Sequence, residues 1–318
     1  MKLNRRQAIS GAALTLAAPT LLSAPPAKAD DMHGPPKVDK GTITYLPNFK
    51  SKHVSPRDVA IWVPDTTHHK GPLPVIYAGD GENLFDADAS KYGSGWNLDL
   101  ILDMLAHQGI GPAIVVANAA IHLERSREYN SPTIARYFDA QMKQMLAQSC
   151  NGELLTEAYF DFIITELKPY IDANFDTKPD RGNTYILGQS MGGMLAVEAL
   201  MARPEVFSGA LGFSAHLFLF GPQQVNYPPD TFDRVEAALQ QAIAEHFPPP
   251  GNAKVYVDRG TVDLDAMYAR PHIAFENALK EKGYIAGKDY IAITQEGASH
   301  FDTFWKIRAP EALRFMLG

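Results

Sequence analysis

From residue 42 onward, short apolar runs alternate with longer segments in which apolar residues recur every three or four positions. Short runs rich in β-branched and aromatic residues predict strands, and the longer periodic segments predict amphipathic helices. Strands are expected at 42–46, 59–63, 75–78, 113–117, 184–187, 209–213, 254–257 and 290–294. Helices are expected at 98–107, 137–148, 154–174, 191–202, 232–246, 265–282 and 301–317.

The order of these elements predicts an α/β protein. After the first two strands, strand and helix alternate, which is typical of a mostly parallel, doubly wound sheet with helices on both faces. The strands at 42–46 and 59–63 have no helix between them and are expected to add an antiparallel edge. Proline-rich loops at 221–230 and 247–251 flank the helix at 232–246. This loop–helix unit is expected to form a small cap over the carboxyl edge of the sheet, where such sheets bind ligands.

The strand predicted at 184–187 runs directly into the sequence Gly188-Gln189-Ser190-Met191-Gly192, and a helix-forming segment follows. This is the G-x-S-x-G pattern of a nucleophile elbow, a sharp strand-to-helix turn that exposes a serine hydroxyl above a sheet. The two glycines allow a close backbone approach that a Cβ atom would prevent. The pattern alone is common, but here strand, motif and helix occur in the required order. Ser190 is therefore the predicted nucleophile of an α/β-hydrolase fold.

A serine hydroxyl attacks a carbonyl only when a base removes its proton, and in this fold the base follows the nucleophile along the chain. His246, His272 and His300 all lie well after the elbow. His246 and His272 fall within predicted helices, whereas His300 lies in a loop of small residues directly after the last predicted strand. His300 is therefore the predicted base.

The carboxylate that orients this histidine should follow the strand predicted at 254–257. Asp263 and Asp265 both qualify by position. Asp263 has the spacing after Gly260 that is usual for the fold, whereas Asp265 also suits a helix N-cap. The spacing favours Asp263 but leaves both residues open.

An oxyanion formed at the substrate carbonyl requires backbone N–H donors. One donor is expected from Met191, the residue after the nucleophile. The other is expected from the turn after the strand at 75–78, with Glu82 as the first choice and Gly81 as the second.

The first 29 residues have the composition of an export signal. Lys2, Arg5 and Arg6 precede an uncharged stretch that ends in Ala27-Lys28-Ala29, an A-x-A cleavage pattern. The adjacent arginines favour a twin-arginine signal, with an ordinary export signal as the alternative. Residues 30–41 are expected to form a loose leader and residues 42–318 a single domain, located in the periplasm or secreted.

Charge and cysteine content exclude several functions. Residues 1–29 hold four of the 29 basic residues and no acidic ones, so their removal changes the net charge from −7 to −11. This acidic balance argues against binding to nucleic acid or to anionic membranes. The short, proline-interrupted apolar stretch also argues against stable membrane insertion. Cys150 is the only cysteine, which excludes an internal disulfide and a zinc site of several thiolates; it is expected to be a small buried side chain.

Several further segments outside the elbow also have the form of conserved-type motifs. They are Asp80-Gly81-Glu82-Asn83-Leu84-Phe85 after a predicted strand, Arg127-Glu128-Tyr129, and Gly297-Ala298-Ser299-His300 with Trp305 beyond it. Together, over residues 42–318, the chain resembles the esterase family that includes enterochelin esterases, S-formylglutathione hydrolases and feruloyl or acetyl-xylan esterases. The resemblance implies the α/β-hydrolase fold and a serine esterase that acts without a metal or an organic cofactor.

The resemblance also bears on the predicted acid and on the predicted oxyanion donors. Close relatives often lack an aspartate at position 263 while they retain the one at 265, which makes Asp263 and Asp265 equal candidates for the acid. Many relatives have histidine in place of Gly79 and glutamine in place of Glu82, so the oxyanion side of this site is expected to differ in polarity.

The expected partner is a small-molecule ester, either an acylated carbohydrate or a siderophore-type ester, as the resemblance implies. An acyltransferase that uses the same residues is one alternative. A non-catalytic binding protein is another, because a fold does not fix a function. The sequence carries no signal for an oligomeric state.

Overall fold

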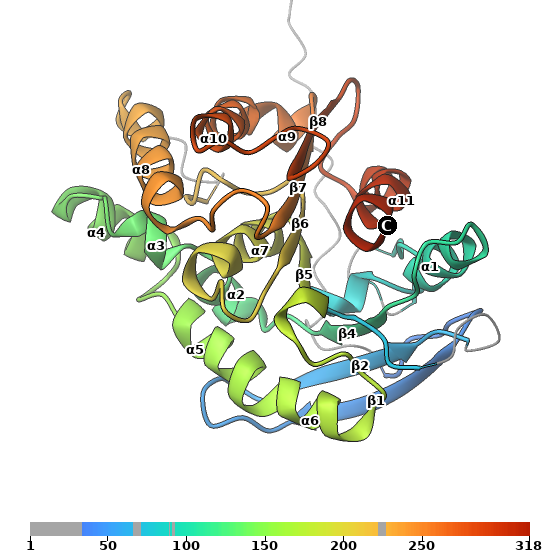
Figure 1. Ribbon diagram of the computed structural model, residues 1–318. Helices are drawn as coiled ribbons and strands as arrows, with labels where there is room; N and C mark the ends of the chain where they lie inside the picture. Colours follow the sequence, from blue (N-terminus) through green and yellow to red (C-terminus); the bar gives the residue numbers. More distant parts are fainter. Residues whose placement is uncertain (1–33, 66–70, 89, 91–92, 222–226) are drawn as a thin grey trace, which may run out of the picture.

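An eight-stranded mixed sheet runs through the centre of the protein in the computed structural model, which describes residues 34–65, 71–88, 90, 93–221 and 227–318 (Figure 1). The strand order is β1-β2-β4-β3-β5-β6-β7-β8. The strands are β1 (Thr42–Phe49), β2 (Arg57–Val63), β3 (Val75–Ala78), β4 (Ile114–Asn118), β5 (Thr184–Gln189), β6 (Gly209–Phe213), β7 (Lys254–Gly260) and β8 (Tyr290–Gln295). The export signal predicted at 1–29 lies outside the described residues.

Strand direction confirms the predicted antiparallel edge. β2 pairs antiparallel with both β1 and β4, whereas the pairs from β4 through β3, β5, β6 and β7 to β8 are all parallel. Consecutive parallel strands need a crossover, and helices provide it here. The carboxyl ends of β3 to β8 therefore meet at one edge of the sheet, which is the edge where open α/β sheets bind ligands.

Helices cover both faces of this sheet (Figure 1), as the doubly wound pattern predicted. The α-helices are α1 (Leu98–His107), α2 (His122–Glu128), α3 (Pro132–Ala135), α4 (Ala140–Ser149), α5 (Thr156–Phe162), α6 (Lys168–Asn174), α7 (Met191–Ala202), α8 (Thr231–His246), α9 (Asp263–Met267), α10 (Ala269–Glu281) and α11 (Asp302–Leu317). The apolar residues of α1 and α11 pack on one face, and those of α5, α7, α8 and α10 pack on the other.

Two helices that the sequence predicts as continuous are interrupted, each near a proline. The segment predicted at 154–174 divides into α5, a π-helical turn at Ile163–Leu167, and α6, which has Pro169 in its first turn. The segment predicted at 265–282 divides into α9 and α10, and Pro271 lies near the start of α10. Proline has no N–H to donate to the carbonyl four residues earlier, which weakens the helix at that point and favours a break there. The break is not obligatory, since α11 continues through Pro310.

The helix predicted as part of a cap, α8, lies elsewhere. It contacts α10, α3 and α7 within the helical layer on one face of the sheet (Figure 1). Its apolar side chains, including Val235, Leu239 and Ile243, are fully buried in the core. The expectation of a cap is therefore wrong, because α8 is the crossover helix that two neighbouring parallel strands, β6 and β7, require.

The leader expected to be loose is held against the domain where the structure describes it. Residues 34–41 contain no helix or strand. The backbone N–H groups of Asp39 and Lys40 donate to the Asp99 carboxylate of α1, and the Trp62 indole donates to the Lys40 carbonyl at 2.7 Å. These bonds attach the segment to α1 and β2.

A buried glutamate joins α7 to the short helix α3. Glu198 accepts hydrogen bonds from the Ser131 hydroxyl and from the hydroxyl and N–H of Thr133, the latter two at 2.6 and 3.2 Å. Complete burial raises the pKa of the Glu198 carboxyl to about 7, although these hydrogen bonds oppose the shift. Folding therefore favours the protonated side chain.

Replacement of Glu198 by glutamine tests this shift. The pKa of Glu198 in the folded protein lies above its ordinary value of 4.5, so the folded protein loses stability as pH rises from 4.5 through about 7. The free energy of unfolding falls by up to ~1.4 kcal/mol per pH unit over this range. Glu198→Gln stays neutral, so its melting temperature relative to the wild type is expected to rise between about pH 5 and about pH 8. Thermal melts at both pH values check this, with the exposed Glu205→Gln as the control. A difference that does not change with pH contradicts it.

Candidate active site

Ser190 occupies a strained turn between the last residue of β5 and the first residue of α7. Its backbone has φ 57° and ψ −120°, which is rare for a residue other than glycine. The turn is fixed by the Ser190 N–H, which donates to the Phe213 carbonyl at 2.8 Å, and by the Ser190 carbonyl, which accepts from the His216 N–H at 2.9 Å. A Cβ atom on Gly188 would lie 2.3 Å from the Gly192 carbonyl. This geometry is that of the predicted elbow.

His300 and Asp265 are paired beside this turn. His300 Nδ1 lies 2.6 Å from Asp265 Oδ1, and the Asp265 side chain is fully buried. Two aromatic rings contact the imidazole edge to face, that of Trp305 at 5.0 Å and that of Tyr268 at 5.5 Å between centroids. The carboxylate and the two rings together fix the orientation of the imidazole.

The second carboxylate oxygen of Asp265, Oδ2, also accepts hydrogen bonds. Oδ2 accepts from the Ser214 hydroxyl at 2.7 Å and from the Gly260 N–H at 2.6 Å. Burial alone would raise the pKa of the Asp265 carboxyl, but the hydrogen bonds and charge of His300, together with Ser214 and Gly260, lower it below its ordinary value. The carboxylate is therefore held ionised and in one orientation.

Asp263, the candidate favoured by spacing, does not face the histidine. It is exposed at the start of α9, with φ 52°, whereas Asp265 is buried. Asp265 is turned toward Ser214 and Gly260, whereas Asp263 lies in solvent. The assignment of Asp263 as the acid partner of His300 is therefore not supported by the structure.

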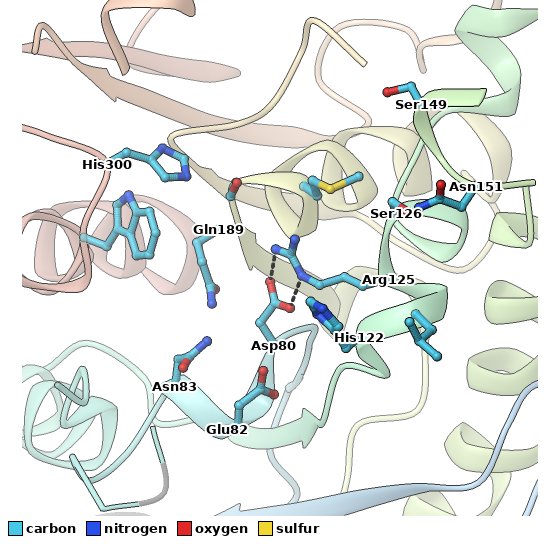
Figure 2. Close-up of a pocket in the computed structure, with 14 residues that line it drawn as sticks. Asp80, Glu82, Asn83, His122, Arg125, Ser126, Ser149, Asn151, Gln189 and His300 are labelled. Carbon is cyan, nitrogen blue, oxygen red and sulfur yellow. Dashed lines mark hydrogen bonds and ion pairs between the residues drawn. The ribbon is translucent and has the colours of Figure 1, made fainter. Parts of the chain in front are cut away.

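Ser190 and His300 line one cavity of about 410 Å³. Ser190, Asp265 and His300 follow β5, β7 and β8, so all three come from the carboxyl edge of the parallel strands. Most of the residues that line it are polar, and α2 and the segment after α4 contribute some of them (Figure 2). Other residues of the lining include Asp80, Glu82, Asn83, Arg125, Gln189 and Trp305.

The predicted oxyanion donors differ in their surroundings. Met191 is the first residue of α7 and lines the cavity, and the first N–H groups of a helix have no partner within it. Glu82 also lines the cavity, and its carboxyl group accepts the N–H of Ala120 at 3.2 Å. Gly81 is packed against β4, where a Cβ atom would lie 2.5 Å from the Ala117 carbonyl carbon.

The charge of Glu82 is reduced by its surroundings. Burial, and secondarily the negative charge of Asp80, raise the pKa of the Glu82 carboxyl well above its ordinary value. The neutral form is therefore favoured, which lessens the repulsion that a glutamate would exert on a developing oxyanion.

An ion pair in the cavity wall is not apparent from the sequence. Arg125 of α2 binds the Asp80 carboxylate through two nitrogens, at 2.5 and 2.7 Å (Figure 2). A second pair, buried between Arg57 of β2 and Glu128, holds the C-terminal end of α2. These residues lie 45 and 71 positions apart, so no local pattern indicates that they meet.

Among the described residues, no group of three or more His, Cys, Asp or Glu side chains is placed to hold a metal ion. Cys150 is buried at the end of α4, as expected, with the Asn130 amide 3.3 Å from its sulfur. No helix in the described part of the chain has the length and hydropathy needed to cross a membrane.

Comparison with known proteins identifies the family to which this chain belongs. The profile of the family described as "Putative esterase" matches residues 53–303. The chain belongs to this family, and it is a carboxylic ester hydrolase with the α/β-hydrolase fold. An endo-1,4-beta-xylanase/feruloyl esterase of Xylanibacter ruminicola is 43% identical over 56 residues, which are 18% of this chain and 8% of that protein. The matched region thus spans less than a tenth of that relative.

Solved structures share the fold at low sequence identity. A ferulic acid esterase superposes with a TM-score of 0.57 at 19% identity, over 87% of this chain and 98% of its own. An IroE-like serine hydrolase from Shewanella oneidensis has a TM-score of 0.59 at 17% identity, over 87% and 80% of the two chains. The enterobactin esterase of Shigella flexneri has a TM-score of 0.58 at 16% identity, over 88% of this chain and 60% of its own.

Proposed function

We propose that this esterase is a serine hydrolase in which Ser190, His300 and Asp265 act as a catalytic triad. The observation that carries the proposal is the 2.6 Å contact between His300 and the buried Asp265, at the rim of the cavity that Ser190 lines. Because a carboxylate only accepts hydrogen bonds, Nδ1 of His300 carries the proton of this contact. Nε2 is then the nitrogen that accepts a proton from serine.

The reaction follows from these positions. The Ser190 hydroxyl attacks the ester carbonyl as its proton moves to His300 Nε2, and the oxyanion is stabilised by the Met191 N–H and a donor from the turn at residues 81–82. Collapse of the tetrahedral intermediate breaks the ester C–O bond, and His300 returns the proton to the departing alcohol. Water, deprotonated by His300, then hydrolyses the acyl-enzyme and regenerates Ser190.

The proposed substrate is an acylated carbohydrate or a siderophore-type ester. The family match and the esterases named above favour such a substrate. The carboxylate, amide and guanidinium side chains in the lining favour an ester with polar groups to pair with them, because an apolar chain would bury them without partners. The proposal also includes export to the periplasm or medium, which Arg5, Arg6 and the Ala27-Lys28-Ala29 sequence support.

Labelling with a fluorophosphonate tests the triad. The wild type is expected to gain one phosphonyl group, seen by intact-mass spectrometry and located on the peptide that contains Ser190. Ser190→Ala is expected to remain unlabelled at the same melting temperature, because the substitution removes only the nucleophilic oxygen. An unlabelled, folded wild type would favour a binding protein on this fold, and labelling at another serine would move the nucleophile elsewhere.

A further inference from the structure

Gln189 interrupts an apolar pattern directly below the nucleophile. Side chains alternate between the faces of a strand, so Gln189 shares a face with Leu187, two residues earlier on β5. Leu187 is fully buried in the core formed with α1 and α11. The same face continues apolar across the sheet at Phe213, the residue that pairs with Gln189 on β6. An apolar residue is therefore expected at 189, yet a primary amide lies there.

The Gln189 amide is buried without a hydrogen-bond partner. The residue is 1% exposed, and neither Oε1 nor Nε2 finds a partner among the described residues. Its polar neighbours in the cavity are better satisfied, since Asn83 Oδ1 accepts from the Ser90 hydroxyl and Glu82 accepts from the Ala120 N–H, both at 3.2 Å. Burying an amide without a partner costs stability, so a bound molecule that pairs with both atoms would recover that cost.

The Gln189 side chain belongs to the wall of the cavity that Ser190 lines. Gln189 and Ser190 line the same cavity, and Figure 2 shows the Gln189 side chain extending toward Asn83, with Asp80 and Glu82 on the same side of the cavity. All four of these polar side chains are at least 96% buried. A molecule that reaches Ser190 therefore lies next to the Gln189 side chain, whose amide carries a donor and an acceptor without partners.

We propose that the Gln189 amide is a specificity subsite that binds adjacent hydroxyl groups of the ester substrate. An amide presents one donor and one acceptor in a single plane, and neighbouring hydroxyls complement both: one oxygen accepts from Nε2 and the other hydroxyl donates to Oε1. Because Gln189 adjoins Ser190, the subsite distinguishes esters that carry these hydroxyls from analogues that lack them. This inference rests on the proposed function of Ser190.

Vicinal hydroxyls occur on sugars and on catechols, and two pairs of esters separate these sources. Methyl caffeate and methyl cinnamate differ in hydroxyls on the acyl group. A mono-acetylated methyl xyloside and cyclohexyl acetate differ in hydroxyls on the alcohol. For at least one pair, wild-type kcat/KM is expected to favour the hydroxylated ester by about 10-fold or more, since a site built for hydroxyls leaves its polar groups unpaired with the analogue.

Gln189→Met keeps the length of the side chain and removes both polar atoms. It is expected to reduce the hydroxyl preference by about 10-fold or more in the same pair, without a loss of melting temperature. Gln189→Glu, which exchanges the donor for an acceptor, is the second variant if Gln189→Met does not fold, and it is also expected to lose the preference. The control is Gln144→Met, an equal change at an exposed position of α4.

The outcomes separate the subsite from the proposed function. A wild type with no hydroxyl preference in either pair, or a folded Gln189 variant with an unchanged preference, overturns the subsite. If the variant lowers kcat/KM equally for both esters of a pair, Gln189 stabilises the elbow and does not bind the substrate hydroxyls. The subsite is then also overturned. Continued hydrolysis by Ser190→Ala instead overturns the proposed function, whatever Gln189 does.

Discussion

Ser190→Ala and His300→Ala are each expected to lower kcat for p-nitrophenyl acetate by about 10⁴-fold or more, and the double variant is expected to be no slower than either single one. The reason is that nucleophile and base act as a unit. Without the Ser190 oxygen, no acyl-enzyme forms, and without the His300 imidazole, nothing removes the hydroxyl proton. What remains is the smaller contribution of binding and of the oxyanion donors.

Initial rates of the three variants and the wild type measure this, with melting temperatures to show that each is folded. Neither substitution removes a buried core side chain, since Ser190 and His300 are both partly exposed at the cavity. Multiplicative losses in the double variant would show that the two residues act independently, and a near wild-type rate in His300→Ala would assign the base elsewhere.

The sequence predicts the parts of this protein whose signals are local. The helix expected at 191–202 matches α7 residue for residue, and the strand before it ends at Gln189, directly before the nucleophile, as the motif requires. Each of the eight expected strands is present within a few residues of its predicted bounds. Strong periodicity and the glycines of the elbow determine these elements, so no knowledge of distant contacts is needed.

Other features depend on contacts that no local pattern describes. The pairing of Arg125 with Asp80 joins segments 45 positions apart, and the place of α8 depends on the strands that it connects. The sequence does carry a signal for Gln189, a polar residue in an otherwise apolar strand end, but its lack of a partner becomes visible only with the fold. The choice between Asp263 and Asp265 likewise required the direction in which α9 begins.

The assignment of Asp265 rather than Asp263 as the acid predicts a second large loss of activity. Asp265→Asn is expected to lower kcat by about 10³- to 10⁴-fold, with Asp263→Asn within about 2-fold of the wild type. An asparagine at 265 retains an oxygen that can accept from the Ser214 hydroxyl and the Gly260 N–H, so the fold is expected to persist. Its amide nitrogen, however, then faces His300 Nδ1 and donates to it.

The imidazole would consequently carry its proton on Nε2, and the nitrogen that should accept the Ser190 proton would no longer be free. Asparagine at 263 keeps the polar, exposed side chain, and this residue type tolerates the positive φ at that position, so the pair of variants is well matched. Kinetics of both proteins on one ester decide the assignment. An equal loss in Asp263→Asn, or full activity in Asp265→Asn, would mean that the 2.6 Å contact with His300 does not orient the base.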